Sequence, residues 1–140
     1  MARDLDRLME AYRRTSFQAE TPVGHLAIRV GQGCPPLDAL LALHGAEEWA
    51  FITACNPGSV RLSDAENGAR MRALHGTIAA RGLIAFDGQG VPDCDDWQPE
   101  PSLLVLGLPP DAALDIGRQF GQLAIVLGRR GEPARLVRCS

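Results

Sequence analysis

Polar side chains that could bind or transform a small molecule flank the most apolar segments of the chain. Asn56-Pro57-Gly58-Ser59 follows the apolar stretch 49–55, Glu100 and Ser102 introduce a second apolar stretch, and Gln122 introduces a third. Amide, hydroxyl and carboxyl groups at the ends of buried strands can reach a ligand while the strands hold them in place. These residues are therefore the first candidates for a binding site.

Asn67 lies on the apolar face of an expected helix. A spacing of four, three and four residues places the members of this stripe on one helix face: Asn67, Met71, Leu74 and Ile78. An amide at the head of a core-facing stripe needs hydrogen-bond partners. Two interpretations stay open: Asn67 ties the turn at 56–59 to the helix, or it points into a ligand pocket.

A turn followed by a capped helix is one way to bind an anion. The backbone N–H groups of Asn56–Ser59 could line such a site, with Arg70 as the charge partner. The segment lacks the lysine and the glycine pattern of a phosphate-binding P-loop, so an ordinary turn is the alternative. Glu100 also has two interpretations, as an ion-pair partner of Arg70 or Arg118 and as a general acid or base.

Other reactive groups give weaker signals. Cys55 follows a strand near a helix N-terminus, which can lower a thiol pKa, but no histidine is close to it in sequence. The four cysteines of the chain have no CxxC spacing, and Asp93, Asp95 and Asp96 miss the EF-hand pattern. We expect neither a metal nor a cofactor. Trp97 either packs the surrounding loop onto the domain or lines a binding surface.

Composition narrows the class of protein. The chain has 140 residues, of which 46% are apolar, and this favours a single domain over residues 1–140. A net charge of −3 argues against nucleic-acid binding. No stretch reaches membrane-spanning length and no signal peptide is visible, so we expect a cytoplasmic protein that does not bind a membrane.

Periodicity and turn residues predict the elements that position these side chains. Ser63 and Glu66 form a capping box at the start of a long helix. A polar loop is expected over 87–99. The expected helices are 3–14, 35–43, 64–81 and 109–121, and the expected strands are 15–20, 26–30, 49–55, 83–86, 102–106, 123–127 and 134–138.

From residue 49 onward the expected order is β-α-β-β-α-β, which is the ferredoxin-like order. The predicted fold is therefore an α+β two-layer sandwich with this core, to which an N-terminal helix, a hairpin and a short helix are added. In this topology the first core strand ends beside the starts of the third and fourth, and near the start of the long helix. The polar residues that should meet there are Thr53, Asn56, Gly58, Ser59, Asn67, Arg70, Glu100, Ser102 and Gln122.

Several motifs resemble those of a bacterial domain-of-unknown-function family, DUF3293, over nearly the whole chain. They are Tyr12-x-x-Thr15, WAFITA at 49–54 with NPGS at 56–59, ENxxR at 66–70, WxxEPS at 97–102, Gly107, and GRxFGQxA at 117–124. Cys55, where a bulkier residue is expected, and Phe17, where Tyr is more usual, depart from the pattern. The resemblance implies no activity, so it supports either a shared site or a shared folding network.

Three functions follow as hypotheses. The first is a binding or regulatory module for a small polar or anionic ligand at the Asn56, Asn67 and Glu100 sheet edge. The second is a small enzyme in which Glu100 is the general acid or base and the two asparagines orient the substrate. The third is a domain that binds a protein partner, with its last strand, 134–138, adding to another sheet. The sequence leaves the oligomeric state open.

Overall fold

Seven strands form one antiparallel sheet in the computed structural model, which describes residues 2–94 and 98–139. Their order across the sheet is β2-β1-β4-β5-β3-β6-β7. The strands are β1 (Thr15–Thr21), β2 (Gly24–Ile28), β3 (Glu48–Ile52), β4 (Ile84–Pro92), β5 (Glu100–Leu106), β6 (Ala124–Arg129) and β7 (Arg135–Arg138). The helices are α1 (Ala2–Arg13), α2 (Pro35–Leu43), the short 3₁₀ turn η1 (Pro57–Ser59), α3 (Asp64–Ala80) and α4 (Pro110–Gln119). The mixed α+β class is thus confirmed. Asp95, Asp96 and Trp97 lie outside the described residues.

The segment from β3 to β6 has the predicted order of helices and strands. β3 lies between β5 and β6 and is antiparallel to both. Ile52, the last residue of β3, pairs with Leu103 in the middle of β5, so the chain after β3 continues toward residues 100–102. Phe51 pairs with Val126 near the start of β6. The carboxyl end of β3 therefore adjoins the amino ends of two neighbouring strands.

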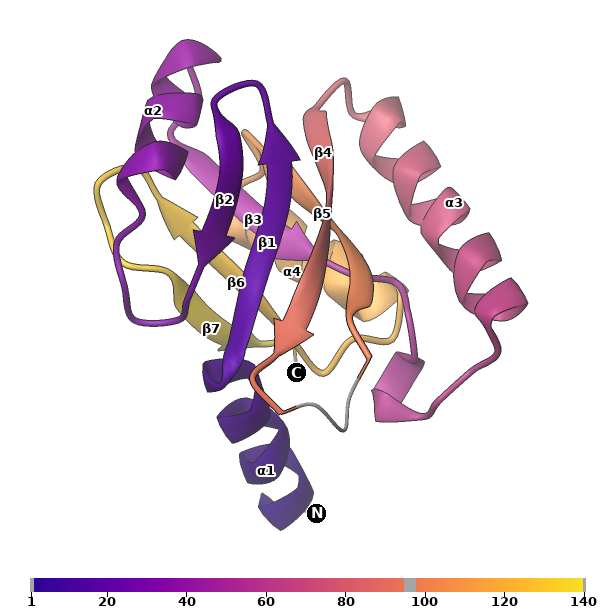
Figure 1. Cartoon of the computed structure of the whole chain (residues 1–140). Coiled ribbons are helices and arrows are strands. Elements are labelled where there is room, and N and C mark those ends of the chain that lie inside the picture. Colours follow the sequence, from indigo (N-terminus) through magenta and orange to yellow (C-terminus); the bar gives the residue numbers. More distant parts are fainter. Residues whose placement is uncertain (1, 95–97, 140) are drawn as a thin grey trace.

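The sheet is strongly curled. Two strands, β4 and β5, lie between β1 and β3 in the sheet order, and neighbouring strands are about 4.8 Å apart. The rings of Phe17 in β1 and Phe51 in β3 nevertheless lie 5.3 Å apart. Figure 1 shows the result: β1 and β2 lie in front of β3, while α4 lies behind it.

Apolar side chains cover both faces of the sheet, which adds a layer to the predicted two-layer sandwich. Ala50 and Ile52 point to one face and contact the buried side of α3 and α4. Trp49 and Phe51 point to the other face, where α2 and the curled hairpin cover them. The reason lies in β3 itself, because consecutive apolar residues on a strand require cover on both sides.

The predicted loop at 87–99 is wrong over its first half. β4 continues to Pro92 and pairs with β1 on one side and β5 on the other. Gly88 permits this pairing, since a Cβ there would lie 2.3 Å from the carbonyl oxygen of Gln18. Glycine usually weakens a strand, so the sequence pattern indicated a loop where close packing of backbones requires the missing side chain.

β3 ends earlier than predicted, at Ile52 instead of Cys55. The hydroxyl of Thr53 accepts a hydrogen bond from the backbone N–H of Cys55 at 3.0 Å. This local bond turns the chain out of the strand ladder. By contrast the capping box of α3 is confirmed, with Ser63 and Glu66 bonded in both directions. Within the described ranges, no helix has the combined length and apolar character that crossing a membrane requires.

Candidate functional site

The predicted polar residues meet where β3 ends and α3 begins, in a region that we call the polar edge (residues 53–59, 66–70, 100–102 and 122). Asn56 is at its centre and has left-handed backbone angles, with φ 49° and ψ 60°. Asparagine tolerates this conformation better than most residues because its short side chain can bond to nearby backbone. The chain reverses there and enters η1.

Asn56 and Asn67 bond to each other in both directions. The backbone N–H of Asn56 donates to Oδ1 of Asn67 at 3.0 Å, and Nδ2 of Asn67 donates to Oδ1 of Asn56 at 2.9 Å. The same Oδ1 of Asn56 accepts from the backbone N–H of Leu62 at 2.9 Å. With these bonds in place, Nδ2 of Asn56 donates to Oε2 of Glu100 at 2.9 Å.

Arg70 donates hydrogen bonds to two backbone carbonyl groups of the protein. Its Nε donates to the carbonyl of Ala54 at 2.6 Å, and Nη2 donates to the carbonyl of Phe120. It therefore joins the end of β3 to the turn between α4 and β6. The ion pairs that we considered between Glu100 and Arg70 or Arg118 are not formed, since Arg118 contacts Asp115 and the carbonyl of Cys139.

The turn at 56–59 and Gln122 complete this link. The backbone N–H of Gly58 donates to the carbonyl of Gly121 at 2.7 Å, and that of Ser59 donates to the carbonyl of Asn56 at 2.9 Å. The buried amide of Gln122 donates to the carbonyl of Cys55 at 3.0 Å. The N–H groups of Gly58 and Ser59 thus bond within the fold.

Two hydroxyl groups of the polar edge also bond to the backbone. Thr53 Oγ1 donates to the carbonyl of Pro101 at 2.7 Å, and Ser102 Oγ donates to the carbonyl of Glu100 at 3.0 Å. The bond from Thr53 fixes the start of β5 next to the end of β3, and the bond from Ser102 lies within β5. Together they hold Glu100, the first residue of β5, beside the end of β3.

A cleft of about 1290 Å³ opens beside the polar edge. Its walls come from α1, β1, the end of β3, the segment 56–68, the start of β5 and the segment 122–126. Figure 1 shows α1 and the turn at 57–59, which precedes α3, at the same end of the sheet, and both contribute residues to the cleft. Of the predicted site residues, the cleft is lined by Thr53, Asn56, Ser59, Asn67, Glu100, Ser102 and Gln122, whereas Gly58 and Arg70 do not line it.

Glu100 is half-buried in this cleft and bonds there only through Oε2. Among the described residues, its other carboxyl oxygen has no hydrogen-bond partner. Burial raises the pKa of Glu100, and the hydrogen bond from Asn56 opposes that rise in part. A carboxyl group of this kind is suited to bind a hydrogen-bond donor or to exchange a proton.

Tyr12 of α1 also belongs to the site, although the pattern of polar residues in the sequence does not predict it. It lines the cleft, and burial together with the nearby Glu100 carboxylate raises the pKa of its phenol far above the ordinary value. The Tyr12 hydroxyl forms no hydrogen bond with any residue in the described part of the chain. The available signal was the Tyr12-x-x-Thr15 motif of the family resemblance, because helical periodicity alone assigns Tyr12 to the core.

Cys55 is positioned as a structural residue. Its side chain is buried, and burial raises the pKa of the thiol, whereas a reactive cysteine needs the opposite shift. Its Sγ donates weakly to the carbonyl of Pro101 at 3.7 Å. Asp93, which we weighed as a metal ligand, instead forms an ion pair with Arg29 at 2.8 Å.

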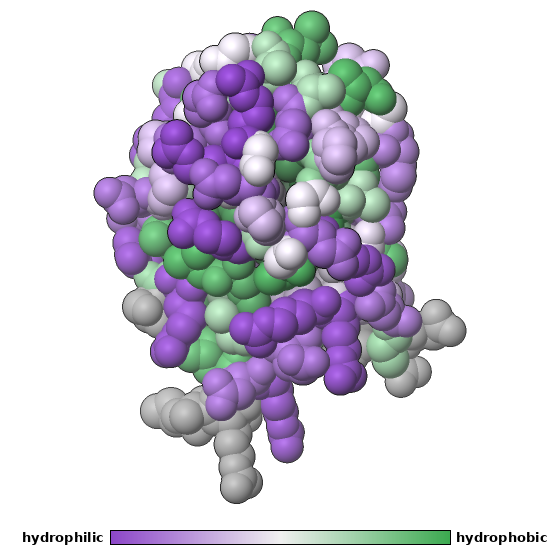
Figure 2. Space-filling model, turned by 90° about the vertical axis from the view of Figure 1, so that its left-hand side faces the viewer, coloured by the Kyte–Doolittle hydropathy of each residue, from purple (hydrophilic) through white to green (hydrophobic). Residues whose placement is uncertain are grey.

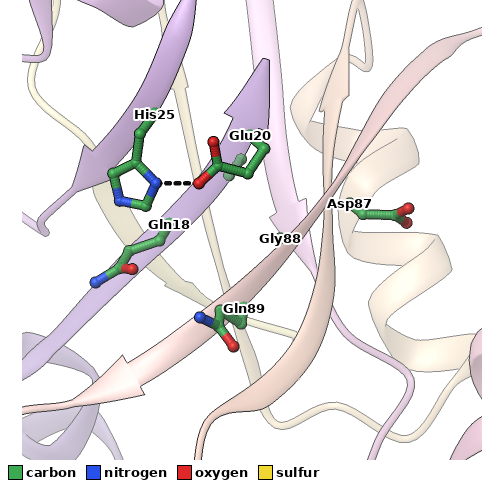
Figure 3. A pocket seen from close by; sticks show the side chains of 7 residues that line it. Gln18, Glu20, His25, Asp87, Gly88 and Gln89 are labelled. Carbon is green, nitrogen blue, oxygen red and sulfur yellow. Dashed lines mark hydrogen bonds and ion pairs between the residues drawn. The ribbon is translucent and has the colours of Figure 1, made fainter.

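A second, shallow depression of about 210 Å³ lies on the outer surface of β1, β2 and β4. Figure 3 shows Glu20 and His25 paired across the hairpin, while Asp87 points away from the other labelled side chains. Asp87 instead pairs with His75 of α3 at 3.3 Å. The depression contains none of the predicted site residues, so the cleft remains the candidate site.

Comparison with known proteins gives one match. A family model described as "Protein of unknown function (DUF3293)" matches residues 52–125. This range covers more than half of the chain and contains the whole polar edge, and the match confirms the family resemblance of the sequence motifs. No curated protein and no solved structure matches the chain.

Proposed function

The chain belongs to the DUF3293 family, whose description assigns no function, and from the geometry of its cleft we propose that it is a binding module for a small polar molecule. One observation carries this proposal. Glu100 faces the cleft with one oxygen fixed by Asn56 and the other without a partner among the described residues. No side-chain oxygen or nitrogen of the described residues is both buried and without a hydrogen bond, so the spare oxygen of Glu100 is open to the cleft and available to a ligand that donates to it.

The hydrogen bonds favour a polar over an anionic ligand. Arg70 and the Gly58 N–H group, which an anion would need, bond to carbonyl groups of the protein. Glu100 itself would repel an anion. We therefore assign Asn56, Asn67 and Arg70 to the scaffold that holds Glu100 and assign recognition to Glu100.

An enzyme is the second candidate, and a specific observation favours it. The raised pKa of Glu100 brings its titration closer to neutral pH, as a general acid or base requires. Tyr12, which lines the same cleft, offers a hydroxyl group to a substrate. The two candidates share one site and differ in whether the bound molecule changes.

Binding of a protein partner at the edge of the sheet is the third candidate. β7 is the last strand in the sheet order, with Leu136 and Val137 half-buried. Figure 2 views this side of the molecule and shows a band of hydrophobic side chains between hydrophilic ones. The exposed Arg135 and Arg138 at the two ends of β7 discourage strand addition, so we rank this candidate below the cleft.

We also propose that β3, α3, β4, β5, α4 and β6 form a ferredoxin-like unit. Their sheet order β4-β5-β3-β6 supports this assignment, as does the position of α3 and α4 on one face. Such units host many unrelated functions, so the assignment adds no evidence for the ligand.

A thermal-shift screen tests the proposed function. Wild type, Glu100→Ala and Asp87→Ala are melted with amino acids, amines, sugars, nucleosides and inorganic phosphate. A compound at about 100 times its Kd should stabilise wild type by about 2.7 kcal/mol. We expect a polar compound to stabilise wild type and Asp87→Ala but not folded Glu100→Ala.

Two other results are informative. If no compound in the screen changes the melting temperature of wild type, or if Glu100→Ala responds as wild type does, the cleft proposal is wrong. Mass spectrometry of any stabilising compound after incubation separates binding from catalysis, because only an enzyme yields a product.

A further inference from the structure

We infer that the cleft accepts an organic cation, an ammonium group on an apolar body, with Glu100 as its counter-ion. This inference rests on the proposed function, because it names the ligand class of the same site. Glu100, the aromatic wall next to it and the Tyr12 hydroxyl support it, and the charges at the rim do not oppose it.

In the part of the chain that the structure describes, Glu100 is not paired with a cationic side chain. Among the described residues it forms no ion pair, and its hydrogen-bond donor is the neutral amide of Asn56. Arg70, the basic residue of the polar edge, points its guanidinium at the carbonyls of Ala54 and Phe120. Burying a carboxylate without a counter-ion is unfavourable, and a cationic ligand removes that penalty.

Aromatic rings form the wall of the cleft next to this carboxyl group. Tyr12, Phe17 and Phe51 all line it. The ring of Phe17 meets that of Tyr12 at 6.1 Å and 88°, and that of Phe51 at 5.3 Å and 66°. Edge-to-face packing fixes the rings. Phe17 and Phe51 are buried, so the half-buried Tyr12 is the ring most open to a ligand, and an aromatic face attracts an ammonium group while also binding apolar carbon.

The Tyr12 hydroxyl supplies a second acceptor. It lines the cleft with no hydrogen bond to a described residue. An ammonium group has several N–H donors and no acceptor, so it can bond to Glu100 and to a phenol oxygen at once. A carboxylate or phosphate ligand could accept from Tyr12 but would meet the charge of Glu100.

The charges at the rim of the cleft do not reverse this preference. Counting the described residues alone, the rim carries three basic and three acidic side chains, namely Arg7, Arg14, Arg61, Glu10, Asp64 and Asp93. All six are exposed, so water and salt screen them. Glu100 is half-buried and less screened, and it therefore dominates the charge that a ligand meets inside.

Three probes with one ring and different head groups test the inference: benzylamine, benzyl alcohol and benzoate. Each is titrated into ¹⁵N-labelled wild type, Glu100→Gln, Tyr12→Phe and Asp87→Asn at mildly alkaline pH, and Kd is taken from the backbone resonances of the polar edge. We expect wild type to bind benzylamine about tenfold more tightly than benzyl alcohol, as a charged hydrogen bond implies. Benzoate should bind most weakly.

The variants separate charge from shape. Glu100→Gln keeps an oxygen that can accept from Asn56 and should bind benzylamine and benzyl alcohol equally. Asp87→Asn removes the same charge outside the cleft and should keep the tenfold preference. Tyr12→Phe keeps the ring and should lose part of the preference, which provides a test if Glu100→Gln fails to fold.

Equal binding of benzylamine and benzyl alcohol by wild type, or tightest binding of benzoate, would overturn the cation inference while the cleft remained a binding site. Absence of any shift at the polar edge with all three probes overturns the inference as well. In that case the thermal-shift screen decides whether the proposed function fails with it, because that screen includes neutral polar molecules.

Discussion

Asn56 and Asn67 exchange two hydrogen bonds, at 3.0 Å and 2.9 Å, although they lie eleven positions apart in the chain. The exchange uses both polar atoms of the Asn67 amide and leaves Nδ2 of Asn56 free to bond to Glu100. Asn67 does not itself bond to Glu100. It positions the residue that does, and this relationship makes the two asparagines experimentally separable from the carboxyl group.

Asn67→Ala should lower the free energy of unfolding by about 2 kcal/mol, because it removes both bonds and leaves the N–H of Asn56 unpaired. Urea denaturation followed by circular dichroism measures the change. Arg72→Ala, an exposed change in the same helix, should stay within about 0.5 kcal/mol of wild type. Equal stability of the two variants would show that the exchange contributes nothing.

Asn56→Gly and Asn56→Ala should differ in stability even though both lose the amide. Asn56 has φ 49°, a backbone conformation that glycine adopts freely and alanine does not. We expect Asn56→Ala to be the less stable by about 1 kcal/mol, measured by the same denaturation. If alanine is tolerated as well as glycine, the turn at 56–59 relaxes and the left-handed conformation is not required.

The polar edge could be predicted from the sequence because local signals fix most of it. The capping box at Ser63 and Glu66 sets where α3 begins, and the spacing from Asn67 to Ile78 sets which face it buries. The order of strands then brings residues 100–102 and 122 to the same end. Local hydrogen bonding and periodicity are sufficient for such a prediction.

The cleft could not be predicted in the same way, because it depends on the curl of the sheet. Tyr12 reaches the cleft that Glu100 faces because β1 folds back over β3. The contact between Phe17 of β1 and Phe51 of β3 shows this arrangement. Gly88 allows β4 to approach β1, yet in the sequence it resembles a turn residue. Long-range backbone contacts of this kind leave no periodic signal.

Gly121→Ala should lower the free energy of unfolding more than Gly45→Ala does, because Gly121 lies in the link between the polar edge and α4. A Cβ at Gly121 would lie 2.7 Å from Cβ of Pro57, and φ there is +72°. Gly45 has a similar φ of +64° with nothing within 4 Å, so Gly45→Ala isolates the conformational cost. We expect a loss of about 1 kcal/mol for Gly45→Ala and roughly 3 kcal/mol for Gly121→Ala.

Thermal or urea unfolding of both alanine variants tests this comparison. An equal loss would mean that Pro57 moves aside at little cost. The hydrogen bond from the Gly58 N–H to the Gly121 carbonyl, at 2.7 Å in wild type, would then contribute little to the position of the turn.

Glu100→Gln should change how stability depends on pH. Burial raises the pKa of Glu100 above its ordinary value of 4.5, so the folded protein holds this proton more tightly than the unfolded chain does. The stability that the folded protein gains by holding this proton is fully present below pH 4.5 and is lost as pH rises through the folded-state pKa. Glutamine does not titrate and can still accept the hydrogen bond from Asn56.

Glu100→Gln should therefore become more stable relative to wild type as pH rises from about 4 to about 8. Urea denaturation of both proteins at several pH values measures the difference in their unfolding free energies, and other titrating groups cancel because the two chains share them. A constant difference would show that Glu100 has the same pKa in the folded and unfolded states. A difference that moves in favour of wild type would mean that a cation within the protein stabilises the carboxylate, which would remove the basis for a cationic ligand.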